Sequence, residues 1–249
     1  MTKHLAVVTL LAGIVACRST PGSVGAATTA AAPAARTGPP CPAPAELTGL
    51  ARVAWGQPDA ADVEVACVAA RLGGGPAWVV YGLARDIPSD DGGETNARHT
   101  AVVTAAPPHA VIAASIEDEL SFTDVDYGER PTYQAADLDG DGTDELVTTL
   151  EASPRGVFTT TLAITTVAGD ELAVSEGIPI GYDDSASDAE PPGPTSCAAD
   201  LRVVPDPDGR GQLIEVTASA ATGDPDVAGA CLSAGVHRFR YVDGALRPQ

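Results

Sequence analysis

Short runs of apolar and β-branched residues recur along the chain, separated by clusters of glycine, proline and acidic residues. Runs of this length and composition predict strands, because helices need apolar positions three and four residues apart over longer spans. We therefore expect a mainly β protein with a single antiparallel domain, built as a sandwich or as partial-propeller-like sheets. The expected strands are residues 63–72, 77–85, 98–105, 110–116, 133–136, 146–150, 157–167, 171–175, 201–204, 213–218 and 236–242.

One segment near the start of this domain has helical spacing instead. Between Glu46 and Trp55, the apolar residues Leu47, Leu50, Val53 and Ala54 fall on one side of a helix, which predicts a short helix there. Aromatic residues make up only 4% of the chain, so the core must consist chiefly of Val, Leu, Ile and Ala. We expect Trp78 and Tyr81 to belong to that core.

Turns and loops are predicted where the apolar runs stop. Residues 73–76, Gly-Gly-Gly-Pro, predict a turn rather than a phosphate-binding loop, because no helix start follows them. The stretches 88–94 and 182–194 are acidic and contain proline, and we expect them to be exposed loops.

The amino terminus has the pattern of an export signal. Lys3 and His4 precede an apolar run over residues 5–16, which is shorter than the roughly twenty residues that span a membrane. Ile14-Val15-Ala16-Cys17 resembles a bacterial lipobox, which implies removal of residues 1–16 and lipidation, including palmitate, at Cys17. An ordinary signal peptide with a coincidental cysteine is the alternative. The residue after Cys17 is Arg18 and not an aspartate, and under the enterobacterial sorting rule this favours the outer membrane. The domain would then lie on the periplasmic or the surface face of that membrane.

Residues 18–45 consist largely of Ala, Pro, Thr, Ser and Gly and contain almost no large apolar side chain. Such a segment cannot bury enough surface to fold. We therefore divide the chain into a signal peptide at 1–16, a lipidated cysteine with a disordered linker at 17–45, and a β domain at 46–249.

The charge of the chain excludes several functions. The formal net charge is −20, and without Lys3, the only lysine, 13 arginines stand against 34 acids, which gives −21. Nucleic acid is therefore not an expected partner. A mature chain without lysine has no phosphate-loop lysine, Schiff-base lysine or Ser-Lys dyad. The motifs Gly-x-Ser-x-Gly, His-Glu-x-x-His and Gly-x-Gly-x-x-Gly are absent too.

Four cysteines remain beyond Cys17, an even number that predicts two disulfides in an exported chain. Three pairings are possible, and we favour the two local bonds because they close short loops. Free thiols and a zinc site are the alternatives, although the Cys-x-x-Cys spacing typical of zinc is absent. The favoured pairs are Cys41 with Cys67 and Cys197 with Cys231.

The strongest chemical signal is the acidic stretch 137–145, Asp-Leu-Asp-Gly-Asp-Gly-Thr-Asp-Glu. Carboxylates about 5 Å apart repel one another by roughly 3 kcal/mol at an effective dielectric constant near 20, and a hard cation offsets that repulsion. Glycines at 140 and 142 let the backbone curl until alternate side chains meet. Ca²⁺ suits such a set better than the smaller Mg²⁺. The expected ligands are the carboxylates of Asp137, Asp139, Asp141 and Glu145 and the backbone carbonyl of Thr143.

An EF-hand does not fit this stretch, because its twelfth position would be Thr148 and its flanks favour strands. Residues 136–146 instead resemble the calcium loops of integrin-α-like FG-GAP and VCBS repeat proteins, which lie in β-hairpins. The pattern occurs once here, so the resemblance implies the loop and not a whole propeller. A plain Asp-Gly turn is the alternative, and it is what we expect at Asp208-Gly209 and Asp243-Gly244.

Candidates for catalysis are His99, His109, His237, the acids 117–119, Asp124 and Asp126, and no spacing ties them together.

The leading hypothesis is a lipid-anchored, calcium-stabilised β domain of the bacterial cell envelope, acting as a non-catalytic binding or scaffold module. Its partners would be the membrane and an envelope or extracellular protein or glycan. The alternatives are a secreted or envelope-bound hydrolase with structural calcium, and a purely structural envelope protein. Arg238 and Arg240 occupy alternate positions of the expected final strand. This alternation predicts either a basic face there or ion pairs with acids of the neighbouring strand.

Overall fold

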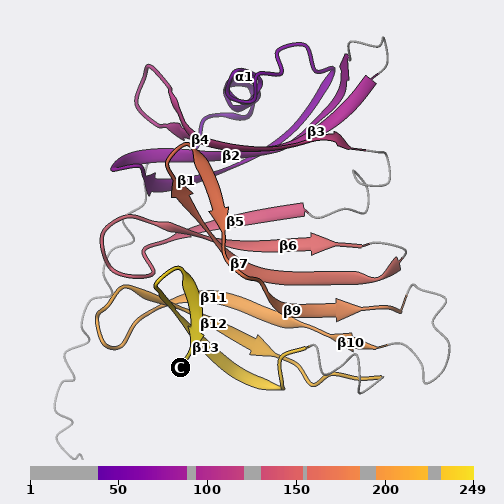
Figure 1. Cartoon of the computed structure of the whole chain (residues 1–249), viewed down its shortest axis with the longest axis vertical. Coiled ribbons are helices and arrows are strands. Elements are labelled where there is room, and N and C mark those ends of the chain that lie inside the picture. Colours follow the sequence, from indigo (N-terminus) through magenta and orange to yellow (C-terminus); the bar gives the residue numbers. More distant parts are fainter. Residues whose placement is uncertain (1–38, 89–93, 121–129, 154–155, 186–194, 224–230) are drawn as a thin grey trace, which may run out of the picture. The chain divides into compact units, whose positions relative to one another are not determined.

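The computed structural model describes residues 39–88, 94–120, 130–153, 156–185, 195–223 and 231–249 (Figure 1). These residues form one helix, α1 (Pro44–Ala54), and fourteen strands arranged in three antiparallel sheets. The mainly β fold and the short helix near its start are both confirmed. The signal peptide, Cys17 and nearly all of the linker lie outside the described residues, so these remain predictions. No helix within the described ranges is long and apolar enough to cross a membrane.

The first sheet is a meander of four strands in chain order, β1 (Asp62–Leu72), β2 (Gly75–Pro88), β3 (Glu94–Thr104) and β4 (Val111–Leu120). The predicted turn joins β1 to β2, where Gly73 and Gly74 have φ angles of 60° and 83°. Helix α1 packs on this sheet because Leu47 and Ala51 are buried against Trp78 and its neighbours.

The second sheet contains β5 (Arg130–Ala136), β6 (Glu145–Ala152), β7 (Phe158–Ala168), β8 (Glu171–Val174), β9 (Ile178–Asp183) and β10 (Ser196–Cys197). Its order is β10-β9-β7-β6-β5, with β8 paired to β7. Consecutive residues of β6 belong to different cores: Leu146 packs with residues of the first sheet, and Val147 packs with residues of the third. Because successive side chains of a strand point to opposite faces, this sheet contributes to a core on each side.

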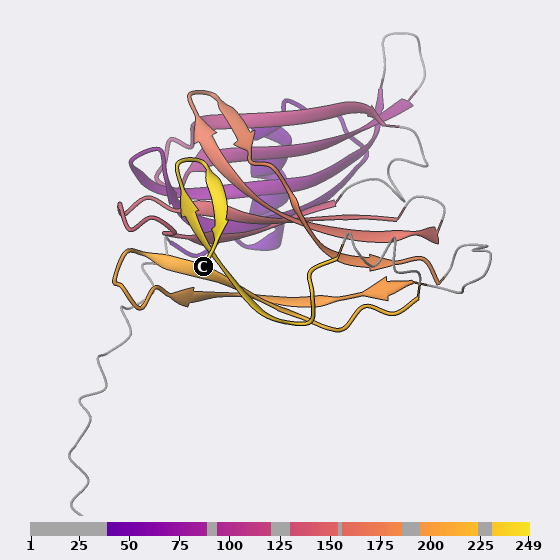
Figure 2. The same cartoon turned by 60° about the horizontal axis from the view of Figure 1, so that its bottom comes forward.

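The third sheet contains β11 (Ala199–Pro205), β12 (Gln212–Ala218), β13 (Gly235–Val242) and β14 (Ala245–Pro248), again in chain order. Ile214 of β12 and Phe239 of β13 are buried in the core that β6 and β7 share. The β13–β14 hairpin, yellow in Figure 2, turns at Asp243 and Gly244, whose φ angles are 50° and 80°. This Asp-Gly pair is the plain turn that we expected.

Two disulfides join the cysteines of the domain. Cys41 pairs with Cys67, which ties the residues before α1 to β1, and Cys197 pairs with Cys231. These are the local pairings that the sequence favoured. The sulfurs are therefore bonded to one another and are not free thiols or zinc ligands.

Three strands were not predicted. Strand β9 contains Pro179 and Gly181, β10 has two residues, and β14 ends at Pro248, so none has an uninterrupted β-branched run. The loop expected over 182–194 is wrong at its start, because Tyr182 and Asp183 belong to β9. The loop expected over 88–94 is wrong at both ends, because Pro88 belongs to β2 and Glu94 to β3. Asp184 is buried, although an exposed loop was expected there. Residues 89–93 and 186–194 of the two expected loops lie outside the described residues.

Candidate metal centre

The acidic loop joins β5 to β6 as a hairpin in which Ala136 pairs with Glu145. Carboxylate oxygens of Asp137, Asp139 and Asp141 all lie within 4.8 Å of one another. Each of these carboxylates also accepts a hydrogen bond from a loop amide. Gly140 N donates to Asp137 at 2.8 Å, Asp141 N donates to Asp139 at 3.1 Å, and Thr143 N donates to Asp141 at 2.6 Å. Gly140 and Gly142 have φ angles of 82° and 90°, which is the curl that the glycine positions predicted.

Glu145, the fourth predicted carboxylate, is 7% exposed and accepts a hydrogen bond from Leu138 N at 2.8 Å. Burial raises the pKa of this carboxyl to about 7, and repulsion from Asp139, Asp141 and Asp137 adds to the rise, while the bond from Leu138 opposes it. Glu145 thus lies close enough to the three aspartates for their negative charges to repel its ionised form. A cation among these four groups would stabilise its ionised form.

Thr143 is half-buried, and its amide donates to Asp141. Ligation through its carbonyl remains a prediction. The neighbouring Asp144 has a different role, because its Oδ2 accepts a hydrogen bond from Arg71 N at 2.6 Å, and its own N donates to Arg71 O at 2.8 Å. Burial raises the pKa of the Asp144 carboxyl. This residue holds the loop against the β1–β2 hairpin, a role that sequence reasoning missed.

The loop also contacts the third sheet. Asp137 N donates to Gln212 Oε1 at 3.1 Å, and Leu138 is buried in the same core cluster as Ile214. Gly211 lies so near the acidic loop that a Cβ on it would be 2.6 Å from Gly140 N and 2.7 Å from Leu138 O. One short loop therefore belongs to the second sheet and contacts both other sheets. No sequence pattern marks Gln212 or Gly211 as its neighbours.

Among the described residues, the donor atoms gathered here are all carboxylate oxygens, and the cluster includes no histidine nitrogen or cysteine sulfur. Hard cations such as Ca²⁺ take oxygen ligands in flexible shells of six to eight, whereas zinc and copper favour nitrogen and sulfur. The residues present thus fit Ca²⁺.

The catalytic candidates are distributed differently. His99 is 1% exposed and stacks on Trp55 with ring centroids 5.0 Å apart. His109 Nδ1 lies 2.9 Å from Thr104 O, and His237 Nε2 lies 2.6 Å from Ser233 O. Among the described residues, none of these contacts links one histidine to another.

The acidic candidates are only partly described. Glu117 forms an ion pair with Arg98. The side chains of residues 118 and 119, together with Asp124 and Asp126, lie outside the described residues. The arrangement that a hydrolase would need therefore remains a hypothesis, and the described part of the chain does not assemble it.

The arginines of the last sheet form cross-strand ion pairs. Arg238 Nη2 lies 2.8 Å from Glu215 Oε2, and Arg240 Nη2 lies 2.9 Å from Oδ2 of the buried Asp206. Of the two interpretations that the sequence left open, the structure supports pairing with acids. Asp208 and Gly209 lie in the β11–β12 turn, where Gly209 N donates to Asp206 O at 2.9 Å, as expected of a plain turn.

Comparison with protein-family models, curated proteins and solved structures gives no match to this chain. The resemblance of residues 136–146 to FG-GAP and VCBS calcium loops therefore stays a prediction.

Proposed function

We propose that this protein is a lipid-anchored, non-catalytic module of the bacterial cell envelope whose β domain binds Ca²⁺ in the loop 137–145. The observation that carries this proposal is the convergence of three aspartate carboxylates within 4.8 Å, beside the buried Glu145. The ligands would be the carboxylates of Asp137, Asp139, Asp141 and Glu145 and the carbonyl of Thr143.

Electrostatics supports a bound cation. Each pair of carboxylates about 5 Å apart costs roughly 3 kcal/mol at an effective dielectric constant near 20, and solvent reduces this at exposed positions such as Asp139 and Asp141. Glu145 has less solvent to screen it, since it is 7% exposed. Ca²⁺ would relieve the repulsion and lower the pKa of Glu145.

The position of the loop supports a structural role for the ion. Asp144 binds Arg71 of the first sheet, and Asp137 binds Gln212 of the third. An ion that fixes the loop would therefore also fix the contacts among the three sheets. This is the effect expected of an ion that stabilises a module rather than one that takes part in a reaction.

The export signal and the cysteine at position 17 support the membrane anchor, and the linker 18–45 would let the domain reach about 80 Å from the bilayer when extended. The outer membrane is the proposed location. The partner would be an envelope or extracellular protein or glycan, since the charge of −20 disfavours nucleic acid.

Thermal unfolding of the oxidised chain from residue 18 onward, with Ca²⁺, with Mg²⁺ and with chelator, tests the ion site. We expect a rise in Tm that is specific to Ca²⁺ and is lost in the double variant Asp139→Asn, Asp141→Asn. The double variant Asp170→Asn, Glu171→Gln removes the same charge at the β7–β8 turn and should keep the response. An unchanged Tm under all three conditions would refute the ion site.

Membrane fractionation of cells that express the full chain tests the anchor. The wild-type protein should sediment with membranes, and Cys17→Ala should appear in the soluble fraction. Membrane association that survives Cys17→Ala would contradict anchoring through this cysteine.

A further inference from the structure

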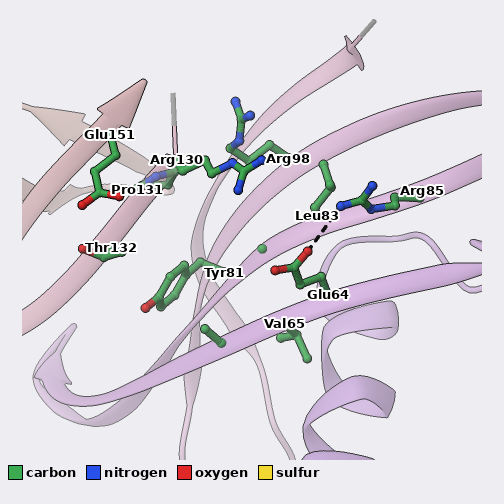
Figure 3. A pocket seen from close by; sticks show the side chains of 12 residues that line it. Glu64, Val65, Tyr81, Leu83, Arg85, Arg98, Arg130, Pro131, Thr132 and Glu151 are labelled. Carbon is green, nitrogen blue, oxygen red and sulfur yellow. Dashed lines mark hydrogen bonds and ion pairs between the residues drawn. The ribbon is translucent and has the colours of Figure 1, made fainter. Parts of the chain in front are cut away.

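A hollow of about 310 Å³ lies where the edge strands β1 and β5 meet (Figure 3). Three arginines line it: Arg85, Arg98 and Arg130. They face four acids, of which two belong to the lining and two pair with these arginines from outside it: Glu64, Glu151, Asp62 and Glu117. The charges here are matched within the chain itself, so the hollow does not select a ligand by its charge.

A different contact between distant residues supports the start of the acidic loop. The β5–β6 ladder ends at the pair of Ala136 with Glu145, so Asp137 is the first residue beyond it. The amide of Asp137 donates a hydrogen bond to Oε1 of Gln212 at 3.1 Å, 75 positions away in the sequence. A side chain of the third sheet therefore holds the first of the proposed calcium ligands.

The backbone of Asp137 controls where its carboxylate points, because the φ and ψ angles of a residue limit the rotamers open to its side chain. Oδ1 of Asp137 accepts a hydrogen bond from Gly140 N at 2.8 Å. A carboxylate oxygen of this residue also lies within 4.8 Å of those of Asp139 and Asp141. A restraint on the Asp137 amide is thus a restraint on the geometry of the whole cluster.

Gly211, the neighbour of Gln212, restrains the same stretch of backbone. A Cβ there would lie 2.7 Å from Leu138 O and 2.8 Å from Asp137 O, so only a glycine lets the two backbones approach this closely. Leu138 is also 1% exposed and packs in the same core cluster as Ile214 of β12. The start of β12 thus forms a wall behind residues 137–138.

The other end of the loop is supported by the first sheet. Arg71 Nε donates to Gly142 O at 3.3 Å, and the amides of Arg71 and Asp144 each donate to the other residue. Since these contacts involve no atom of the third sheet, a change at Gln212 would leave them in place. The two ends of the loop can therefore be tested separately.

We propose that Gln212 is a positioning residue of the calcium site and that the packing of the third sheet thereby sets the affinity of the loop for Ca²⁺. This inference rests on the calcium site proposed above. Without the bond to Gln212, Asp137 would sample other orientations, and the apparent affinity would fall with the fraction of molecules whose ligands are in place. A loop that is held before the ion arrives also loses less conformational entropy on binding.

Titration of Ca²⁺ into the oxidised chain from residue 18 onward, followed by calorimetry, tests this role. Gln212→Met keeps a long unbranched side chain but has no oxygen to accept the Asp137 amide, so we expect Ca²⁺ to bind about fivefold more weakly. Gln212→Glu retains an acceptor and should bind Ca²⁺ at least as tightly as the wild type. Ser219→Ala is the matched control and should keep wild-type affinity, because it removes two hydrogen bonds with Ala198 at the opposite end of β12.

Amide exchange with chelator present, followed by NMR, separates positioning from a general loss of stability. In Gln212→Met the Asp137 amide should exchange faster than in the wild type, whereas the Asp144 amide, which bonds to Arg71 O, should keep its rate. Loss of protection at both amides would assign the effect to overall stability and would overturn the proposal.

The measured affinities decide between the remaining outcomes. Equal Ca²⁺ affinity in the wild type and in Gln212→Met, or an equal loss in Ser219→Ala, would refute the role of Gln212 and leave the calcium site intact. A wild-type chain that binds no Ca²⁺ would refute the site and, with it, this role.

Discussion

Arg71 and Asp144 lie 73 positions apart in the sequence and are joined by two hydrogen bonds that run in opposite directions. The amide of Arg71 donates to the Asp144 carboxylate at 2.6 Å, and the amide of Asp144 donates to the Arg71 carbonyl at 2.8 Å. The end of the β1–β2 hairpin is thereby fixed to the acidic loop. The position of the candidate metal ligands thus depends on a contact outside their own segment.

Asp144→Ala should lower the free energy of unfolding by about 1 kcal/mol, because it removes the acceptor of the Arg71 amide. Asp144→Asn retains a side-chain oxygen and should lose much less. Urea unfolding of the two variants with chelator measures the difference. Equal losses in the two variants would show that the charge of Asp144, and not its hydrogen bond, is what matters.

Gly211→Ala should destabilise the domain by about 3 kcal/mol or more, because a Cβ there meets backbone atoms of Gly140, Leu138 and Asp137 at 2.6 to 2.8 Å. Gly209→Ala is the matched control, since Gly209 also has a positive φ, 72°, but has nothing within 4 Å of its Cβ position. That control should lose only about 1 kcal/mol. Comparing Tm values of the two variants checks the prediction, and similar shifts would argue against tight packing at the loop.

Without calcium, Glu145 should make stability fall as pH rises. Burial raises its pKa to about 7 from the usual 4.5 of a glutamate, so the folded state holds the proton more tightly than the unfolded state does. Stability should therefore decrease between about pH 4.5 and pH 7, by about 1–2 kcal/mol. Denaturant unfolding across this range, with chelator present, measures the slope.

Glu145→Gln should flatten that slope, because glutamine does not titrate and its side-chain oxygen can still accept the bond from Leu138 N. Glu171→Gln, at an exposed position of β8, should leave the slope as it is in the wild type. Excess Ca²⁺ should reduce the slope in the wild type, since the ion favours the ionised carboxylate. A slope of wild-type size in Glu145→Gln would assign it to another group.

Each disulfide should contribute about 3.5 kcal/mol in the chain-entropy model, because the bonded cysteines are 26 and 34 residues apart. The paired variants Cys41→Ser, Cys67→Ser and Cys197→Ser, Cys231→Ser remove one bond each. Their free energies of unfolding should fall by similar amounts. A loss well above this value in the first pair would show that the cysteines also support the packing of α1.

The sequence predicted most strands because β-branched runs bounded by turn residues mark them locally. It did not predict β9 or β14, where Pro179, Gly181 and Pro248 interrupt the run and pairing with a neighbouring strand supplies the hydrogen bonds. The acidic loop was predicted for a similar local reason, since alternate carboxylates separated by glycines form a pattern within nine residues. The roles of Asp144 and Gly211 could not be predicted, because each depends on a residue far away in the chain.

By itself the sequence determined the strand-rich fold class, the acidic charge, the even set of cysteines and the spacing of the candidate calcium ligands. These properties depend on composition and on side chains a few positions apart, where chain geometry leaves few choices. Only the tertiary structure decided that the loop contacts all three sheets and that Arg85, Arg98 and Arg130 line one hollow. Contacts between distant segments depend on how whole sheets pack, which no local pattern specifies.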